Sequence, residues 1–272
     1  MLHSAGMTVL AGLGVRPGWQ VPLVEPRAIR SGERQAEWQL RLLGGFELTH
    51  HGSTVIAPQR PQRLLALLSL NRGWQPRGAI AERLWSDVDA TRAGASLRAT
   101  LTTLRRCGLG QVVECNRAAV RLALDVRTDV ELAMDLCRRI QRRELGRASR
   151  YTEVSFLTPH LLPTWDDEWL VVEREHYHQL SLQALEVLWD QWTAAGDFAS
   201  AIEASLGVLR RDPLCEPALR ALVRGYAMDG NVGAALVQVR RYERLLKSEL
   251  GAEPSDMMLD IKQLLLPARA RA

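Results

Sequence analysis

The most regular pattern in this chain is an amphipathic one over residues 91–107. In a helix that turns by about 100° per residue, Leu97, Leu101 and Leu104 fall on one stripe. The opposite side carries arginines and threonines and no acidic residue. The spacing therefore predicts a helix that buries its leucines and presents a basic side to its surroundings.

Three short alternating segments precede this helix. Apolar and polar residues alternate over residues 38–43, 46–49 and 54–56. Gly44-Gly45 and His51-Gly52 separate these segments and are typical turn sequences. The pattern predicts a small antiparallel sheet.

Two further helices and a hairpin belong to the same part of the chain. Residues 61–70, with a proline at the first position, and residues 77–85 predict helices. Residues 111–115 and 120–124 predict a hairpin around Asn116-Arg117. A sheet, three helices and a hairpin in this order are typical of a winged helix. In that fold the third helix enters the major groove of DNA, and the hairpin, or wing, contacts the flanking backbone.

From residue 128 onward the pattern is helical and contains an internal repeat. Gly196 and Gly230 lie 34 residues apart, the period of tetratricopeptide units, each of two antiparallel helices. We expect helices over 128–145, 166–185 and 256–266 to supply the neighbours that two units need. A plain helical bundle is the alternative. The apolar positions that correspond are Leu185, Leu188, Trp192, Phe198 and Ala201 in the first unit and Leu219, Leu222, Tyr226, Val232 and Ala235 in the second.

These patterns divide the chain into three segments. Residues 1–37, rich in glycine and proline without a period, predict a loose or disordered extension. Residues 38–125 predict a winged-helix DNA-binding domain and residues 126–272 an all-α, tetratricopeptide-like domain. The expected fold is therefore mainly α, with an N-terminal winged helix that has a small β-sheet and a wing hairpin.

The distribution of charge supports a nucleic-acid partner for the middle segment. Residues 38–125 hold 12 basic and six acidic residues, whereas the rest of the chain is nearly balanced. A localised excess of this kind is typical of a module that binds double-stranded DNA. A basic helix face that is merely solvated is the alternative.

No apolar run reaches the roughly 20 residues that span a bilayer, and no secretory signal is evident, so we expect a cytoplasmic protein without membrane contact.

Motifs of enzymes and cofactor sites are missing from the sequence. Cys107, Cys115, Cys137 and Cys215 have no spacing typical of zinc and predict reduced, mostly packed thiols. Neither a nucleophile elbow, G-x-S-x-G, nor a phosphate-binding loop, G-x-x-x-x-G-K-[ST], occurs. We therefore expect no metal, no cofactor and no enzymatic activity.

The acidic run 166–168 precedes an apolar helical stretch, where it would complement a helix N-terminus.

Six stretches together resemble the Streptomyces antibiotic regulatory protein family in its short form, a winged helix joined to a bacterial transcriptional activator domain. They follow the order that the family has. They are LRLLGGFEL (40–48), LLALL (64–68), LRATLTTLRR (97–106), LLPTWDDEW (161–169), DPLCEPALR (212–220) and ELGAEPS (249–255).

The resemblance implies an activator that binds tandem repeats upstream of biosynthetic genes, contacts RNA polymerase and places two protomers on adjacent repeats as a homodimer. Larger relatives append a nucleotide-binding domain whose motif this chain lacks, so ATP is not expected. A rival hypothesis is a tetratricopeptide-type interaction scaffold without specific DNA binding. The residues expected to contact DNA are Arg92, Arg98, Thr102, Thr103, Arg105 and Arg106 of the third helix, with Arg117 of the wing, although family wings usually carry glycines followed by an aromatic residue.

Overall fold

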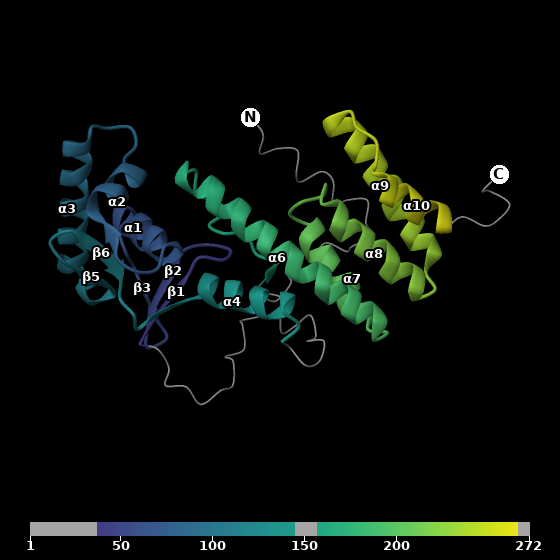
Figure 1. Ribbon diagram of the computed structural model, residues 1–272, viewed down its shortest axis with the longest axis horizontal. Helices are drawn as coiled ribbons and strands as arrows, with labels where there is room; N and C mark the ends of the chain where they lie inside the picture. Colours follow the sequence, from purple (N-terminus) through teal and green to yellow (C-terminus); the bar gives the residue numbers. More distant parts are fainter. Residues whose placement is uncertain (1–36, 145–156, 266–272) are drawn as a thin grey trace. The chain divides into compact units, whose positions relative to one another are not determined.

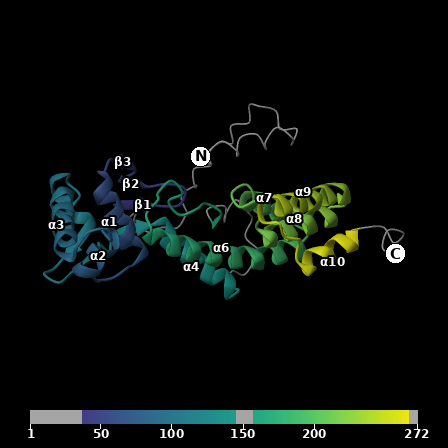
Figure 2. The same cartoon turned by 90° about the horizontal axis from the view of Figure 1, so that it is seen from above.

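The computed structural model describes residues 37–144 and 157–265 (Figures 1 and 2). The fold is mainly α, as predicted: a winged helix with small sheets comes first, and tetratricopeptide-like helices follow. The expected loose extension lies outside the described residues except for Glu37. The boundary expected after residue 125 stays a prediction.

The first sheet contains the three predicted strands and one more. In spatial order it is β3 (Ser53–Val55), β2 (Glu47–His50), β1 (Trp38–Arg41) and β7 (Val126–Thr128). β1 pairs antiparallel with β2, which the short turns require, but parallel with β7. β7 was not expected, because three residues carry no periodicity that could be recognised. The fourth strand of the first sheet, β7, therefore comes directly before the helical part of the chain.

Three helices and a second sheet complete the winged helix. The predicted helices and hairpin are confirmed, although the first helix begins two residues before the expected Pro61. Because the first N–H groups of a helix have no partner within it, proline is tolerated throughout the first turn. The elements are α1 (Gln59–Leu70), β4 (Gln75–Pro76), α2 (Arg77–Leu84), α3 (Ala90–Arg106), the 3-10 turn η2 (Gly110–Val112), β5 (Val113–Cys115) and β6 (Ala119–Leu122), with sheet order β4-β6-β5.

One half-buried carboxylate joins the first helix after β7 to the first sheet. Asp129 begins α4 (Asp129–Gln141), and its two oxygens accept the backbone N–H groups of Leu42 and Leu43, each at 2.9 Å. Burial raises the pKa of this carboxyl, while the backbone hydrogen bonds oppose that rise. The bonds satisfy two N–H groups at the point where the chain leaves β1.

The loop before the next helix also pairs with the end of β1. Leu43 and Leu161 form an isolated antiparallel bridge, and Leu162 N–H donates to the Leu42 carbonyl at 2.9 Å. The acidic run 166–168 lies directly before the helix, where it was expected to complement the helix N-terminus. The helix begins at Trp169 without a side-chain cap, and the Asp167 carboxylate pairs with Arg63 of α1.

The 34-residue repeat is confirmed as two helix–turn–helix units. At Gly196 and Gly230 the backbone has φ of 74° and 80°, a left-handed conformation that favours glycine just after a helix. Asp197 and Asn231 then cap the following helices, accepting the N–H groups three residues on. The units are α6 (Trp169–Ala194) with α7 (Phe198–Leu209) and α8 (Glu216–Met228) with α9 (Val232–Leu250), followed by α10 (Asp256–Leu265).

The expected bounds of the flanking helices differ from those observed. The prediction over 128–145 corresponds to α4, which ends at Gln141, and the prediction over 256–266 to α10. The prediction over 166–185 was too short, because α6 continues through 26 residues into the first repeat unit. Its buried residues continue from Trp169 to Trp192, so the apolar pattern has no break at which to divide the helix.

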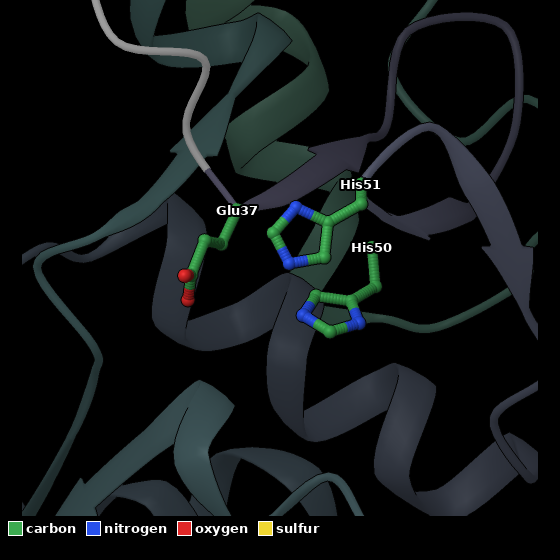
Figure 3. Close-up of side chains that lie close together, drawn as sticks. All are labelled: Glu37, His50 and His51. Atoms are coloured by element: carbon green, nitrogen blue, oxygen red, sulfur yellow. The ribbon is translucent and has the colours of Figure 1, made fainter.

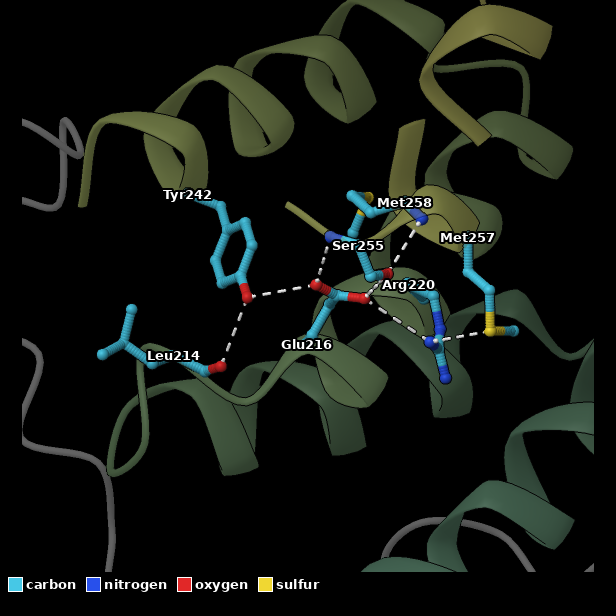
Figure 4. A network of polar contacts seen from close by, with 7 residues as sticks. All are labelled: Leu214, Glu216, Arg220, Tyr242, Ser255, Met257 and Met258. Carbon is cyan, nitrogen blue, oxygen red and sulfur yellow. Dashed lines mark hydrogen bonds and ion pairs between the residues drawn. The ribbon is translucent and has the colours of Figure 1, made fainter. Parts of the chain in front are cut away.

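A polar network around Glu216 holds the last helix to the second repeat unit (Figure 4). The Glu216 carboxylate accepts the backbone N–H of Ser255 at 3.2 Å and the Ser255 hydroxyl, and it lies 3.5 Å from the Arg220 guanidinium. Tyr242 of α9 donates to the same carboxylate at 3.4 Å. Burial, with the nearby Glu216 charge, raises the pKa of Tyr242 to about 12. One carboxylate therefore joins α8, α9 and the residue before α10.

Candidate nucleic-acid interface

The start of α3 is set by one acidic residue. Asp89 is the N-cap, and its side chain accepts the N–H groups of Thr91 and Arg92 at 3.0 and 3.1 Å. Such a cap satisfies two of the four N–H groups left open at a helix start. The Arg92 Nε atom lies 3.3 Å from the same carboxylate, yet its side chain is 80% exposed. Arg92 thus pairs with Asp89 at the start of α3 while its side chain stays exposed to solvent.

The leucine stripe of α3 faces the inside of the winged helix, as the sequence predicted. Leu97, Leu101 and Leu104 are buried, together with Ala93 and Thr100, and α3 contacts α1 and α2. Thr100 satisfies its hydroxyl by donating to the Ser96 carbonyl at 2.8 Å. This burial turns the opposite side of α3 outward (Figure 1).

The outward side of α3 carries the residues singled out from the sequence. Thr103 is half-buried, and the remaining five are exposed. No acidic residue interrupts this side between Ala90 and Arg106, so its charge is uniformly positive. The exposed five are Arg92, Arg98, Thr102, Arg105 and Arg106.

The two threonines are oriented by the helix itself. The hydroxyls of Thr102 and Thr103 donate to the carbonyls of Arg98 and Ala99, each at 3.0 Å. Because the hydroxyl proton is used within the helix, the oxygen is left as an acceptor and the methyl group as an apolar contact. These are the features that can meet a base amino group or a thymine methyl.

Arg98 lies back along the helix toward a glycine. A Cβ atom added to Gly94 would lie 3.6 Å from the Arg98 Nη1 atom. The Arg98 guanidinium therefore lies beside Gly94, at a distance that is ordinary van der Waals contact.

The wing is held to the start of α2. Arg77 Nε and Nη2 donate to the Asn116 carbonyl at 3.1 and 2.9 Å, and Asn116 Oδ1 accepts the N–H groups of Ala118 and Ala119. Arg117 is exposed at the tip. The sequence offered no sign of the role of Arg77, because the two partners are 39 residues apart.

The base of the wing is fixed by a second arginine. Arg121 pairs with Glu114 across the two strands at 2.6 Å, and its guanidinium carbon lies 4.6 Å from the centre of the Trp74 ring. Arg121 is therefore committed to wing structure. Arg117 and Arg121, close in sequence, thus differ in their availability to a partner.

Comparison with known proteins identifies the helical part. Residues 155–266 match the bacterial transcriptional activator domain. Over 265 residues, 93% of this chain, the sequence is 26% identical to the regulatory protein AfsR of Streptomyces coelicolor. Along almost its whole length the chain is therefore similar to a regulatory protein. It combines a winged helix with the activator domain in the expected order, and it spans about a quarter, 26%, of the length of AfsR.

A solved structure shows a similar fold. The chain of Mycobacterium tuberculosis EmbR, determined in complex with a low-affinity phosphopeptide, superposes with a TM-score of 0.64 at 19% identity. The match covers 87% of this chain and 66% of EmbR.

Among the described residues, no helix has the length and apolar character needed to cross a membrane.

Proposed function

We propose that this protein is a sequence-specific DNA-binding regulator of transcription that inserts α3 into the major groove of double-stranded DNA. The observation that carries the proposal is the orientation of α3. Its leucines are buried, and its opposite side exposes arginines and threonines without an acidic residue. A helix presented in this way can contact both phosphates and base edges.

The proposed contacts follow from the position of each side chain. Arg98 and Arg106 read base edges, because a guanidinium can bond guanine in a bidentate manner. Thr102 reads a neighbouring base through its methyl group and acceptor oxygen, and half-buried Thr103 supports it. Arg92 and Arg105 hold phosphates.

The wing supplies a further phosphate contact through Arg117. Its tip is held by Arg77, so the arginine projects from a defined turn. The wing departs from the glycine-and-aromatic sequence of related wings, and we therefore assign it to backbone contact without base reading.

The activator domain and the family resemblance support a wider role. We infer that the protein activates a biosynthetic gene cluster by binding tandem repeats as a homodimer and contacting RNA polymerase. We also infer that it acts in the cytoplasm without an enzymatic step of its own.

The proposal is tested by measuring DNA binding of the full chain. Selection from a random pool of duplexes identifies the preferred site, and fluorescence anisotropy then compares that site with random sequence over a range of salt. We expect a large preference, and log K should fall with log salt with a slope of about −0.9 per phosphate neutralised. Arg106→Ala should weaken binding to the preferred site at least fivefold, whereas Arg224→Ala, an exposed arginine of α8, should bind like the parent.

Two outcomes contradict the proposal. If Arg106→Ala bound the selected site like the parent, the assignment of the exposed side of α3 would be wrong. If neither sequence preference nor salt dependence were found, the interaction scaffold would be favoured instead.

A further inference from the structure

Three side chains that can bind a metal ion meet at one edge of the first sheet. Glu37 lies just before β1, and His50 and His51 lie at the end of β2 (Figure 3). One ligand atom from each lies within 4.8 Å of the other two. Within the ranges that the structure describes, no other three histidine, cysteine or acidic side chains come this close. Figure 3 shows the two imidazole rings and the carboxylate on the same side of the hairpin.

The backbone at His51 explains why neighbouring histidines share one side. Successive side chains of a strand point to opposite faces, which would separate His50 from His51. His51 instead has φ of 49°, and Gly52 has φ of 80°, so the chain turns within the left-handed region. Histidine is among the residues that tolerate this conformation. The backbone N–H of His51 donates to the Glu37 carbonyl at 2.9 Å, which brings Glu37 next to the turn.

The ring of His50 is held by stacking. Its centroid lies 4.1 Å from that of Trp38 with an angle of 19° between the planes, and Trp38 is buried. Stacking covers a face of the imidazole and leaves the nitrogens at its edge available. The rings of His50 and His51 have centroids 4.2 Å apart.

These three side chains have no other polar role in the described structure. Neither imidazole nor the Glu37 carboxylate takes part in a side-chain hydrogen bond or ion pair within the described residues. Imidazoles and carboxylates that stabilise a fold normally do so through such bonds. The cluster therefore has free ligand atoms already gathered by the backbone.

We propose that Glu37, His50 and His51 bind a zinc ion. Two imidazole nitrogens and one carboxylate oxygen suit zinc, and water completes a tetrahedral site. Ligand atoms about 2.0–2.2 Å from the ion lie roughly 3.4 Å from one another. Rotation of the exposed Glu37 and His51 side chains can bring the three atoms from within 4.8 Å to that separation.

Zinc at this position would join the start of β1 to the turn between β2 and β3. The unfolded chain does not hold these ligands together, so the ion would stabilise the folded state. The ligands are separate from the residues proposed to contact DNA, so zinc binding and DNA binding can be tested independently.

The test uses the metal-free full chain and zinc ion as the probe. We expect one equivalent of zinc in a titration against a chromophoric competitor, a rise in Tm on zinc addition, and the absorption of tetrahedral cobalt when Co²⁺ replaces zinc. His51→Asn keeps a residue that tolerates the left-handed turn, Glu37→Gln keeps the side-chain size, and His50→Phe keeps an aromatic ring against Trp38. Each should weaken zinc binding at least about tenfold and abolish the rise in Tm.

A matched control distinguishes this site from adventitious binding. His176→Asn removes an exposed histidine of α6 and should leave zinc affinity unchanged. A parent chain whose Tm does not respond to zinc would overturn the proposal. The rings of His160 and His178 also lie near each other, with centroids 6.3 Å apart. Zinc affinity that persists in His51→Asn and Glu37→Gln but is lost in His178→Asn would place the ion there and would also overturn the proposal. Circular dichroism checks that each variant is folded. If His50→Phe does not fold, His51→Asn and Glu37→Gln alone test the zinc site.

Discussion

Arg63 of α1 and Asp167, two residues before α6, form an ion pair with 2.5 Å between Nη2 and Oδ1. Arg63 also donates to the Leu84 carbonyl at 2.9 Å, and the Asp167 carboxylate accepts the Trp169 indole N–H at 3.1 Å. Their side chains are only 27% and 13% exposed. The pair therefore joins the winged helix to the loop before α6, and both side chains are largely shielded from solvent.

Breaking this pair should destabilise the protein more than loss of a surface ion pair would. Arg63→Met leaves the Asp167 charge without its partner, and we expect a loss of about 1–3 kcal/mol in the free energy of unfolding. Urea denaturation of Arg63→Met, Asp167→Asn and the double variant measures the coupling. Additive effects of the two single changes would show that the pair contributes no interaction of its own.

Thr102 should affect the choice of DNA sequence more than the strength of binding. Its hydroxyl donates to Arg98, so only the methyl group and the acceptor oxygen face a partner. We expect Thr102→Ala to shift the preferred base at one position by about 1 kcal/mol while overall affinity changes less. Thr102→Val, which keeps the methyl group and replaces the hydroxyl by a second methyl, should retain any preference for thymine. Selection from random duplexes with parent and variants measures this, and unchanged profiles for both would exclude a reading role.

The crossing of α7 and α8 depends on Gly225. A Cβ atom there would lie 2.9 Å from Cγ1 of Ile202, which is too close for a real contact. We expect Gly225→Ala to destabilise the protein by about 1–2 kcal/mol, since overpacking exceeds the gain in helix propensity. Gly233 of α9 is the matched control, because a Cβ there meets nothing within 4 Å. Gly233→Ala should be neutral or stabilising in thermal unfolding, and equal effects of both changes would contradict the packing argument.

The four cysteines should differ in reactivity. Cys107 is exposed, whereas Cys137 and Cys215 are buried. Burial raises the pKa of the Cys137 thiol to about 12 and that of Cys215 to about 11. In a thiol titration near pH 8 we expect Cys107 to react rapidly and the buried pair only after unfolding. Cys107→Ser should remove the fast phase, and a fast phase that remained would contradict this order.

The same shifts predict a dependence of stability on pH. The folded state holds both buried thiol protons more tightly than the unfolded state, whose thiols titrate near pH 8.5. Their contribution to stability is therefore complete below that pH and is lost as pH rises toward 11 or 12. Cys137→Ala should lower the free energy of unfolding at pH 7 but reduce its decline between pH 8 and pH 10.

Local patterns in the sequence were sufficient for the orientation of α3 and for most of the elements, although not for the short strands β4 and β7. Leu97, Leu101 and Leu104 repeat at helical spacing, and burial of that stripe leaves only one side of the helix to face outward. Gly196 and Gly230 end helices at equivalent positions because glycine accepts the left-handed backbone found there. Such features depend on neighbours within one or two helical turns, and periodicity records them directly.

Contacts between distant residues were decided by the tertiary structure alone. Asp129 meets Leu42 across 87 positions, and Arg63 meets Asp167 across 104. The Glu37 carboxylate lies near both histidines only because the left-handed turn at His51 puts the His51 ring on the same side as the His50 ring. Hydrophobic periodicity tells which side of an element is buried, but it does not tell which element lies against it. The partners of a carboxylate, a guanidinium or an imidazole follow only when the chain has brought its segments together.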